Sequence, residues 1–206
     1  MSQFFQVHPV NPQTRLMSQA AAIIRDGGVV VYPTDSGYAI GSLAVNKHAL
    51  EQIIRIRQLE PSHHLTLMCR DLSELSVYAR VENSAFRLLR NNTPGPYTFI
   101  LRGTKEVPRR LLNAKRKTIG LRVPDSPIAL ALLEALGEPM LSGSLILPGN
   151  DFTESDPEVI RDKLEKQVEL IIDGGVVGEQ PTTVVDLSGG DVEIIRHGHG
   201  DITPFS

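Results

Sequence analysis

The stretch from Gly27 to Gly41 constrains the fold more than any other part of the chain. Its apolar run, Val29 to Val31, predicts a buried strand that ends at Pro33, because proline cannot donate to a strand ladder. A polar cluster, Thr34-Asp35-Ser36, separates this strand from a second one, Tyr38 to Leu43. The cluster therefore lies at the open end of a strand, where α/β proteins tend to build ligand sites. The alternative is an ordinary hairpin turn.

Helices and strands alternate along the rest of the chain. Helical spacing of apolar residues, with capping signals, predicts helices at about 14–26, after Asn46, at 84–91, 127–136 and 155–166. In the helix after Asn46, Ile53 and Ile54 are expected on the buried face, and a capping box at Ser155 opens the last helix. Short apolar runs predict further strands at 65–69, 97–101, 118–123, 140–147, 168–172, 183–187 and 192–195. The pattern favours one α/β domain on a twisted, mixed parallel and antiparallel sheet flanked by helices.

Length and composition indicate an ordinary globular protein. The chain has 206 residues, of which 41% are hydrophobic and 22% charged, enough for one domain with a full core. Its longest apolar runs are too short to span a bilayer, and no secretory signal is expected, so no membrane partner is predicted. The single cysteine, Cys69, cannot form an internal disulfide and lies in an apolar run. We therefore expect it to be buried, in a protein of the reducing cytoplasm.

Positive charge is concentrated in one segment of a chain whose net charge is −3. Only Glu106 opposes the seven basic residues of this segment, and the other positions hold 14 basic and 23 acidic residues. Such a local excess predicts contact with an anionic partner, although a solvated loop is the simpler alternative. The seven, called here the basic loop, are Arg102, Lys105, Arg109, Arg110, Lys115, Arg116 and Lys117.

Familiar catalytic and metal signatures are missing from the sequence. The pairs His63-His64 and His197-Gly-His199 lack cysteine or carboxylate partners at a known spacing, so no protein-bound metal is expected. No glycine-rich phosphate loop is found, so a bound nucleotide would be held by scattered hydroxyls and arginines. Candidates stand at the predicted strand ends, where each alone is more simply a structural residue: Thr34, Thr66, Thr118, Arg122, Ser142, Ser144, Thr182, Thr183 and Arg196.

Five short motifs occur in an order that resembles the YrdC-like family of threonylcarbamoyl-adenylate synthases and their paralogues, most closely its YciO branch. The motifs are Tyr32-Pro-Thr-Asp, Thr118-Ile-Gly-Leu-Arg-Val-Pro-Asp, Ser142-Gly-Ser, Thr182-Thr-Val-Val-Asp and Ile195-Arg-His-Gly. The resemblance covers a domain at 14–200, leaving 1–13 and 201–206 as terminal extensions. It implies a twisted mixed sheet with a wide, concave, basic surface.

The resemblance also implies a reaction and a site. Family synthases join L-threonine, bicarbonate and ATP into threonylcarbamoyl-AMP and pyrophosphate, with Mg²⁺ on the ATP phosphates, for N6-threonylcarbamoyladenosine in tRNA. By resemblance, an L-threonine-like substrate would contact Thr34, Thr66, Arg122, Ser142 and Thr182. ATP or its adenylate would contact Arg57, Thr118, Ser144 and Arg196.

The chain departs from the family pattern at four positions. Where family synthases carry Lys-x-Arg, a gapless alignment places Arg57-Gln-Leu59, and where they carry Ser-x-Asn it places Ser142-Gly-Ser144. A further family lysine falls on His63. An alternative alignment matches Arg55-Ile-Arg57 to the two basic positions, at the cost of a two-residue insertion. The gapless alignment is preferred, and it replaces a phosphate-facing arginine by leucine, which removes a charge-assisted hydrogen bond worth about 1.5–3 kcal/mol. Neither alignment predicts full synthase activity.

Three functions fit these observations. The first is a protein that binds double-stranded RNA or tRNA together with ATP or AMP. Because aromatic content is only 5%, such RNA would be read through phosphates and shape rather than by stacking. The second is an active but weakened threonylcarbamoyl-AMP synthase. The third is a sensor that binds nucleotide without turnover.

Overall fold

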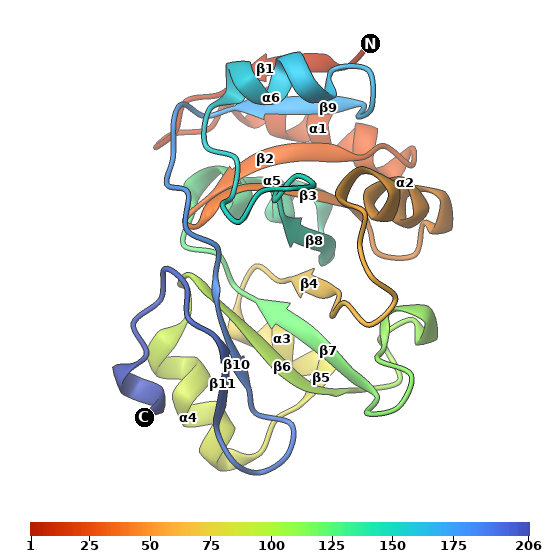
Figure 1. The fold of residues 1–206 in the computed structure, drawn as a ribbon. Coiled ribbons are helices and arrows are strands. Elements are labelled where there is room, and N and C mark those ends of the chain that lie inside the picture. The colour runs from red at the N-terminus through yellow and green to blue at the C-terminus, as the bar shows by residue number, and fades with distance from the viewer.

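The computed structural model describes residues 1–206 as one large sheet with helices on both sides (Figure 1). The helices are α1 (Thr14–Arg25), α2 (Lys47–Arg57), α3 (Leu72–Tyr78), α4 (Asn83–Asn92), α5 (Pro127–Leu136) and α6 (Pro157–Leu164). The strands are β1 (Gln3–Gln6), β2 (Val30–Thr34), β3 (Gly37–Leu43), β4 (Thr66–Met68), β5 (Ala79–Arg80), β6 (Tyr97–Gly103), β7 (Thr118–Arg122), β8 (Met140–Ser144), β9 (Leu170–Asp173), β10 (Thr183–Asp186) and β11 (Glu193–Arg196).

The sheet has 11 strands in the order β1-β9-β2-β3-β8-β4-β7-β6-β10-β11, with β5 against β6. The sheet contains both parallel pairs, such as β4 with β7, and antiparallel pairs, such as β6 with β7. The prediction of a mixed sheet in an α/β domain is thus confirmed. Late in the chain, β10 and β11 form an antiparallel pair, whereas β10 joins β6 in parallel.

Two halves of unequal charge meet where β8 pairs with β4. We call residues 66–122 and 182–206 the basic half, since they hold 13 basic and 8 acidic residues. The remaining residues form the acidic half, with 8 basic and 16 acidic. In Figure 1 the acidic half, with α1, α2, α5 and α6, lies above the basic half, with α3 and α4.

Helix α5 shows how local signals fix an element at its predicted boundaries. Ser126 caps its N-terminus through the Ala129 N–H, and Pro127 occupies the first turn, where a missing N–H costs nothing. Gly137 ends the helix in the left-handed conformation, at φ 79°. Its apolar face packs with α1 in one of two buried clusters, which also contains residues of β2 and β3. The apolar pattern of the α5 sequence therefore predicts the helix layer that covers these strands.

Several local predictions were wrong. Strand β2 continues through Pro33 to Thr34, because β9 pairs only with Val30 and Val31 and leaves the rest of that edge free of a neighbour. In α2 the buried face includes Ile56 in place of Ile54, which is 37% exposed. The cap of α6 is Asp156, one residue after the predicted Ser155.

Three elements were not predicted. Helix α3 is capped by the Asp71 carboxylate, and the two residues of β5 follow it directly. Strand β1 lies before residue 14 and extends the sheet by pairing in parallel with β9.

Cys69 is buried as a free thiol, as predicted, and burial raises its pKa. None of the helices has the length and apolar character needed to span a bilayer.

Candidate functional site

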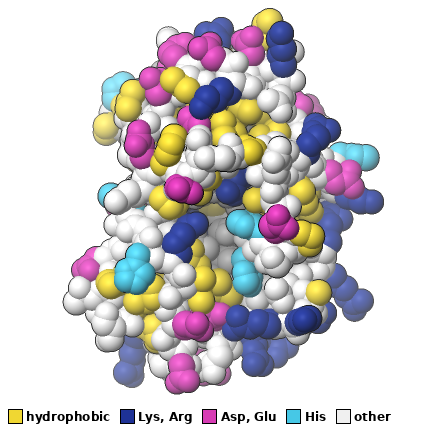
Figure 2. Space-filling model, in the orientation of Figure 1, with side chains coloured by type: hydrophobic (Ala, Val, Ile, Leu, Met, Phe, Trp, Pro, Cys, Tyr) yellow, Lys and Arg dark blue, Asp and Glu magenta, His cyan; other side chains and the backbone are white.

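A cavity of about 430 Å³ opens where the two halves meet. Its walls come from the end of α2, the loop after it, and strands β4, β6, β7, β8, β10 and β11. Figure 2 shows the hollow at mid-height, with basic side chains inside it. Three arginines and two histidines line the cavity, and no carboxylate does. Seven of the nine residues predicted to bind small ligands line it: Arg57, Thr66, Arg122, Ser142, Ser144, Thr182 and Arg196.

Arg122, at the end of β7, is the most buried cation of the site, with 4% of its surface exposed. Asp35 of the β2–β3 turn pairs with one of its terminal nitrogens, and the second Asp35 oxygen accepts the Asp125 N–H at 3.1 Å. The Arg122 Nε has no partner. Burial lowers the pKa of Arg122, and Asp35 and Tyr32 partly oppose that shift. The pair thus holds the guanidinium in place at the wall of the cavity.

Hydroxyls accompany this guanidinium on neighbouring strands. In the pairing of β4 with β8, Thr66 lies opposite Ser142, whose hydroxyl is hydrogen-bonded to the Tyr32 hydroxyl. The hydroxyls of Thr98 and Thr182 lie 2.9 Å apart where β6 meets the start of β10. The site can therefore offer both a cation and several hydroxyls to a carboxylate-bearing ligand.

Arg196, on β11, is held by Thr182, the residue just before the neighbouring strand β10. Its Nε donates to the Thr182 carbonyl and a terminal nitrogen to the Thr182 hydroxyl, both at 3.0 Å. Burial lowers the pKa of Arg196. The guanidinium therefore lines the cavity without a carboxylate partner, which leaves its charge available to an anion.

Arg57, the last residue of α2, lines the cavity on the opposite side. Its Nε donates to the Ile146 carbonyl at 3.3 Å. Burial, reinforced by the positive charge of Arg196, lowers the pKa of Arg57 to about 10, so it stays charged at neutral pH. Two cations of like charge in one cavity, with no acid between them, form an arrangement suited to an anion.

The geometry distinguishes the two possible alignments of this region. Arg57, Leu59, His63 and Ser144 all line the cavity, as the gapless alignment requires. Arg55 is exposed and borders a different groove near Lys166 and Glu169. The positions at which the resemblance implies departures therefore line the cavity.

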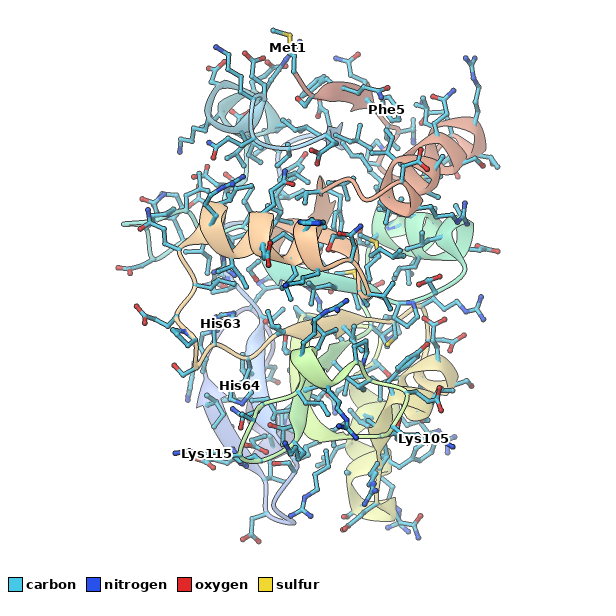
Figure 3. All side chains as sticks on the ribbon, turned by 90° about the vertical axis from the view of Figure 1, so that its right-hand side faces the viewer. Met1, Phe5, His63, His64, Lys105 and Lys115 are labelled. Atoms are coloured by element: carbon cyan, nitrogen blue, oxygen red, sulfur yellow. The ribbon has the colours of Figure 1, made fainter.

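His63 and His64 lie on the loop that leads from α2 to β4, and both line the cavity (Figure 3). Partial burial, then the positive charges of Arg57, His64 and Arg196, lower the pKa of His63 to about 4. The Nε2 of His64 is buried without a hydrogen-bond partner. No group of three or more His, Cys, Asp or Glu could hold a metal ion.

Two predicted residues do not line the cavity. Thr34 is buried at the end of β2, and its hydroxyl donates to the Gly37 carbonyl at 2.7 Å. Thr118 is buried at the far end of β7, where its hydroxyl has no partner. Conversely, Thr98 lines the cavity but is not among the predicted site residues. Because side chains alternate between the two faces of a strand, its position one residue after Tyr97 in the predicted strand could have indicated the cavity-facing side.

All seven residues of the basic loop are exposed. Three bind within the protein, since Arg102 donates to the Ser188 carbonyl, Arg110 to the Val45 carbonyl, and Arg116 pairs with Asp186 at 2.8 Å. No ion pair holds the other four, Lys105, Arg109, Lys115 and Lys117. Figure 3 shows Lys105 and Lys115 on opposite sides of this face, below His63 and His64. The loop is thus a cationic surface beside the cavity rather than part of it.

Comparisons with known proteins identify relatives of this chain. A family model for Sua5, YciO and YrdC, described as "Telomere recombination", matches residues 22–198. The chain is 67% identical to YciO of Escherichia coli (strain K12) over 205 residues, 100% of both chains. It is 30% identical over 182 residues to the threonylcarbamoyl-AMP synthase of Pyrococcus abyssi, covering 87% of this chain and 53% of that protein.

Solved structures give the same result. The crystal structure of E. coli YciO matches with a TM-score of 0.98 at 67% identity, over 100% of both chains. The crystal structure of P. abyssi Sua5 complexed with L-threonine matches with a TM-score of 0.87 at 26% identity, over 96% of this chain and 58% of that one. The resemblance predicted from the five motifs is therefore confirmed, and the chain belongs to the Sua5/YciO/YrdC family.

Proposed function

We propose that the cavity binds an adenine nucleotide next to a small carboxylate-bearing ligand of the L-threonine type. The observation that carries this proposal is that Arg57, Arg122 and Arg196 line one cavity that contains no lining carboxylate. The L-threonine complex of P. abyssi Sua5 supports an amino-acid ligand in this fold. Related threonylcarbamoyl-AMP synthase chemistry supports the nucleotide.

In this proposal the two ligands occupy different ends of the cavity. Arg122 pairs with the ligand carboxylate, while Thr66, Ser142 and Thr182 supply hydroxyls to it. Arg57, Ser144 and Arg196 contact the phosphate, and Mg²⁺ accompanies ATP. Synthase chemistry needs mainly alignment and compensation of developing negative charge, so this arrangement is compatible with slow turnover.

The test of turnover is pyrophosphate release from ATP and Mg²⁺ with bicarbonate, with and without L-threonine. Threonine-dependent release, lost in Arg122→Met, would establish a weakened synthase that serves tRNA modification. If nucleotide binds but no pyrophosphate appears, the protein is a nucleotide-binding member without synthase activity. If neither nucleotide nor L-threonine binds to the folded protein, the proposal is wrong.

The basic loop favours a second activity, the binding of double-stranded RNA or tRNA. Its four unpaired cations lie on an exposed surface of the basic half, which fits phosphate contacts in the cytoplasm. Fluorescence anisotropy with tRNA and with an RNA duplex, over a series of salt concentrations, tests this. Affinity should fall steeply with salt, whereas absent or salt-insensitive binding would contradict it.

A further inference from the structure

The sheet ends in two strands, β1 and β11, whose outer edges are protected to different degrees. Strand β11 begins with Glu193 and ends with Arg196, and the register of its pairing with β10 shifts. Charged side chains and irregular pairing are the usual means by which an edge strand avoids joining another sheet. Strand β1, Gln3-Phe-Phe-Gln6, pairs regularly with β9, and residues 1–14 contain no Asp, Glu, Lys or Arg. The edge of β1 is therefore open to a further strand.

Hydrogen bonds show which backbone groups of β1 point outward. The N–H groups of Gln3 and Val7 donate to carbonyls on or next to β9, at 2.9 and 2.8 Å. Because alternate residues of a strand bond the same parallel neighbour, Phe5 also faces β9, whereas Phe4 and Gln6 turn their N–H and C=O groups away from it. No strand lies on that side, since β1 is the last strand of the sheet. These four backbone groups are thus left without a partner strand.

The two faces of β1 are already packed, so only its edge is available. Phe4 packs against one core cluster, and the Arg161 guanidinium lies 4.5 Å from the centre of its ring. Phe5 packs against the other cluster, and both rings remain partly exposed. Figure 3 shows Phe5 near the top of the molecule, far from His63 and His64 of the cavity. The geometry of this edge suits an extended strand rather than a helix.

We propose that a second copy of this chain adds its own β1 to this edge, antiparallel, about a two-fold axis between the two Phe5 residues. In an antiparallel pair, residues that lie directly opposite can exchange both of their hydrogen bonds. Phe4 of each copy then lies opposite Gln6 of the other, which satisfies all the outward groups of both copies. Phe5 lies opposite its counterpart in a non-hydrogen-bonded pair, where side chains approach most closely and aromatic rings stabilise the pairing.

Strand β1 is complementary to itself rather than to a charged segment of another protein. A two-fold interface needs a surface that matches its own copy. In this register Phe4 and Gln6 match one another, Phe5 meets Phe5, and no like charges lie opposite on the strand. Because β1 lies at one end of the sheet and the basic half at the other, the dimer carries its two basic loops at its far ends.

Charge and size set the strength of this association. The acidic half, which includes β1, holds 8 basic and 16 acidic residues, so these halves of two copies repel each other. Salt screens that repulsion and should strengthen the dimer, whereas it weakens RNA binding. The interface consists of a few backbone hydrogen bonds and one aromatic pair, so we expect a dissociation constant on the order of 10–100 μM.

Sedimentation equilibrium of the full chain, from about 5 to 500 μM at low and high salt, tests the association. A reversible dimer that salt strengthens is expected. Gln6→Pro removes an outward N–H without touching the bonds to β9, and it should weaken the dimer about ten-fold or more. Gln6→Val, which keeps that N–H, is the matched control and should dimerise like the native chain. A monomer at every concentration, or equal association of Gln6→Pro and the control, would overturn the proposal.

Cysteine cross-linking tests the register and does not depend on the folding of Gln6→Pro. Phe5→Cys should form a disulfide dimer under mild oxidation, because the two positions lie directly opposite with Cα atoms about 4.5 Å apart. Gln3→Cys, exposed on the same strand, lies opposite Val7 of the second copy and about 13 Å from its own counterpart, so it should not cross-link. The native Cys69 is buried. Equal cross-linking of both variants, or none in Phe5→Cys, would contradict the proposed pairing.

Discussion

The two halves of the protein contribute to the cavity in different ways. The basic half supplies Arg122, Arg196 and three threonines to the lining. The acidic half supplies Arg57, Leu59, His63 and Ser144, the four positions at which the sequence resemblance implies departures from the family motifs. In the proposed function, the wall from the basic half holds the ligand carboxylate, and the wall from the acidic half faces the phosphate with Arg57 as its only arginine. Binding and turnover should therefore respond separately to changes in the two halves.

The largest effect is expected where the halves are joined by charge. Arg122→Met leaves Asp35 without its partner, and both side chains are largely buried. Removing one member of a buried ion pair costs about 3–5 kcal/mol, so urea denaturation should show that loss in the free energy of unfolding. The double variant with Asp35→Asn should recover part of it. A loss below about 1 kcal/mol in Arg122→Met would show that the pair does not hold the halves together.

The next effect concerns the acidic half alone. Leu59→Arg with Ser144→Asn restores family donors, and threonine-dependent pyrophosphate release should rise about ten-fold or more, because each new charge-assisted hydrogen bond can lower the barrier. Gln58→Arg is the control and should leave release unchanged. If the double variant behaves like the control, the gapless alignment is wrong about what these positions do.

A smaller effect is expected on RNA affinity, which should depend on lysines of the basic half and not on lysines of the acidic half. Lys115→Gln with Lys117→Gln removes two free cations of the basic loop, so the slope of log affinity against log salt should fall by about one to two. The matched control, Lys47→Gln with Lys166→Gln, removes two exposed lysines from the acidic half. Equal changes in both variants would exclude the basic loop as the specific RNA surface.

The smallest effect is a pH dependence of stability. The pKa of His63 is about 4 in the folded protein and near 6.5 in the unfolded chain. Between these pH values the unfolded chain binds a proton at His63 that the folded protein does not bind, which favours unfolding. As pH falls from 6.5 towards 4, native protein should lose stability relative to His63→Gln. His8→Gln, at an exposed site outside the cavity, provides the control. If the free energy of unfolding falls with pH equally in native protein and His63→Gln, the lowered pKa of His63 is contradicted.

Sequence patterns predicted elements that depend on local signals. The boundaries of α5 follow from Ser126, Pro127 and Gly137 alone, and the Asn46 cap fixes the start of α2. Strand β1 was missed because a four-residue strand gains its stability from β9, far along the chain. The continuation of β2 through Pro33 depends on where β9 stops pairing, which no local pattern contains.

The candidate site was predictable as a set of residues but not as a geometry. The family resemblance brought Arg57, Arg122 and Arg196 into one hypothesis, and the structure brings them into one cavity. The pairing of Asp35 with Arg122 joins positions 87 residues apart, which spacing cannot reveal. Thr34 and Thr118 belonged to the same motifs, yet the direction of their side chains leaves them outside the lining.

The central claim is that an anionic nucleotide binds in the cavity between the halves. Equilibrium dialysis of labelled AMP against native protein, Arg57→Leu and Arg55→Leu tests it most directly, since the two arginines are neighbours on α2 but only Arg57 lines the cavity. The account predicts about ten-fold or greater weakening in Arg57→Leu and native affinity in Arg55→Leu. Equal affinity in all three proteins would contradict it.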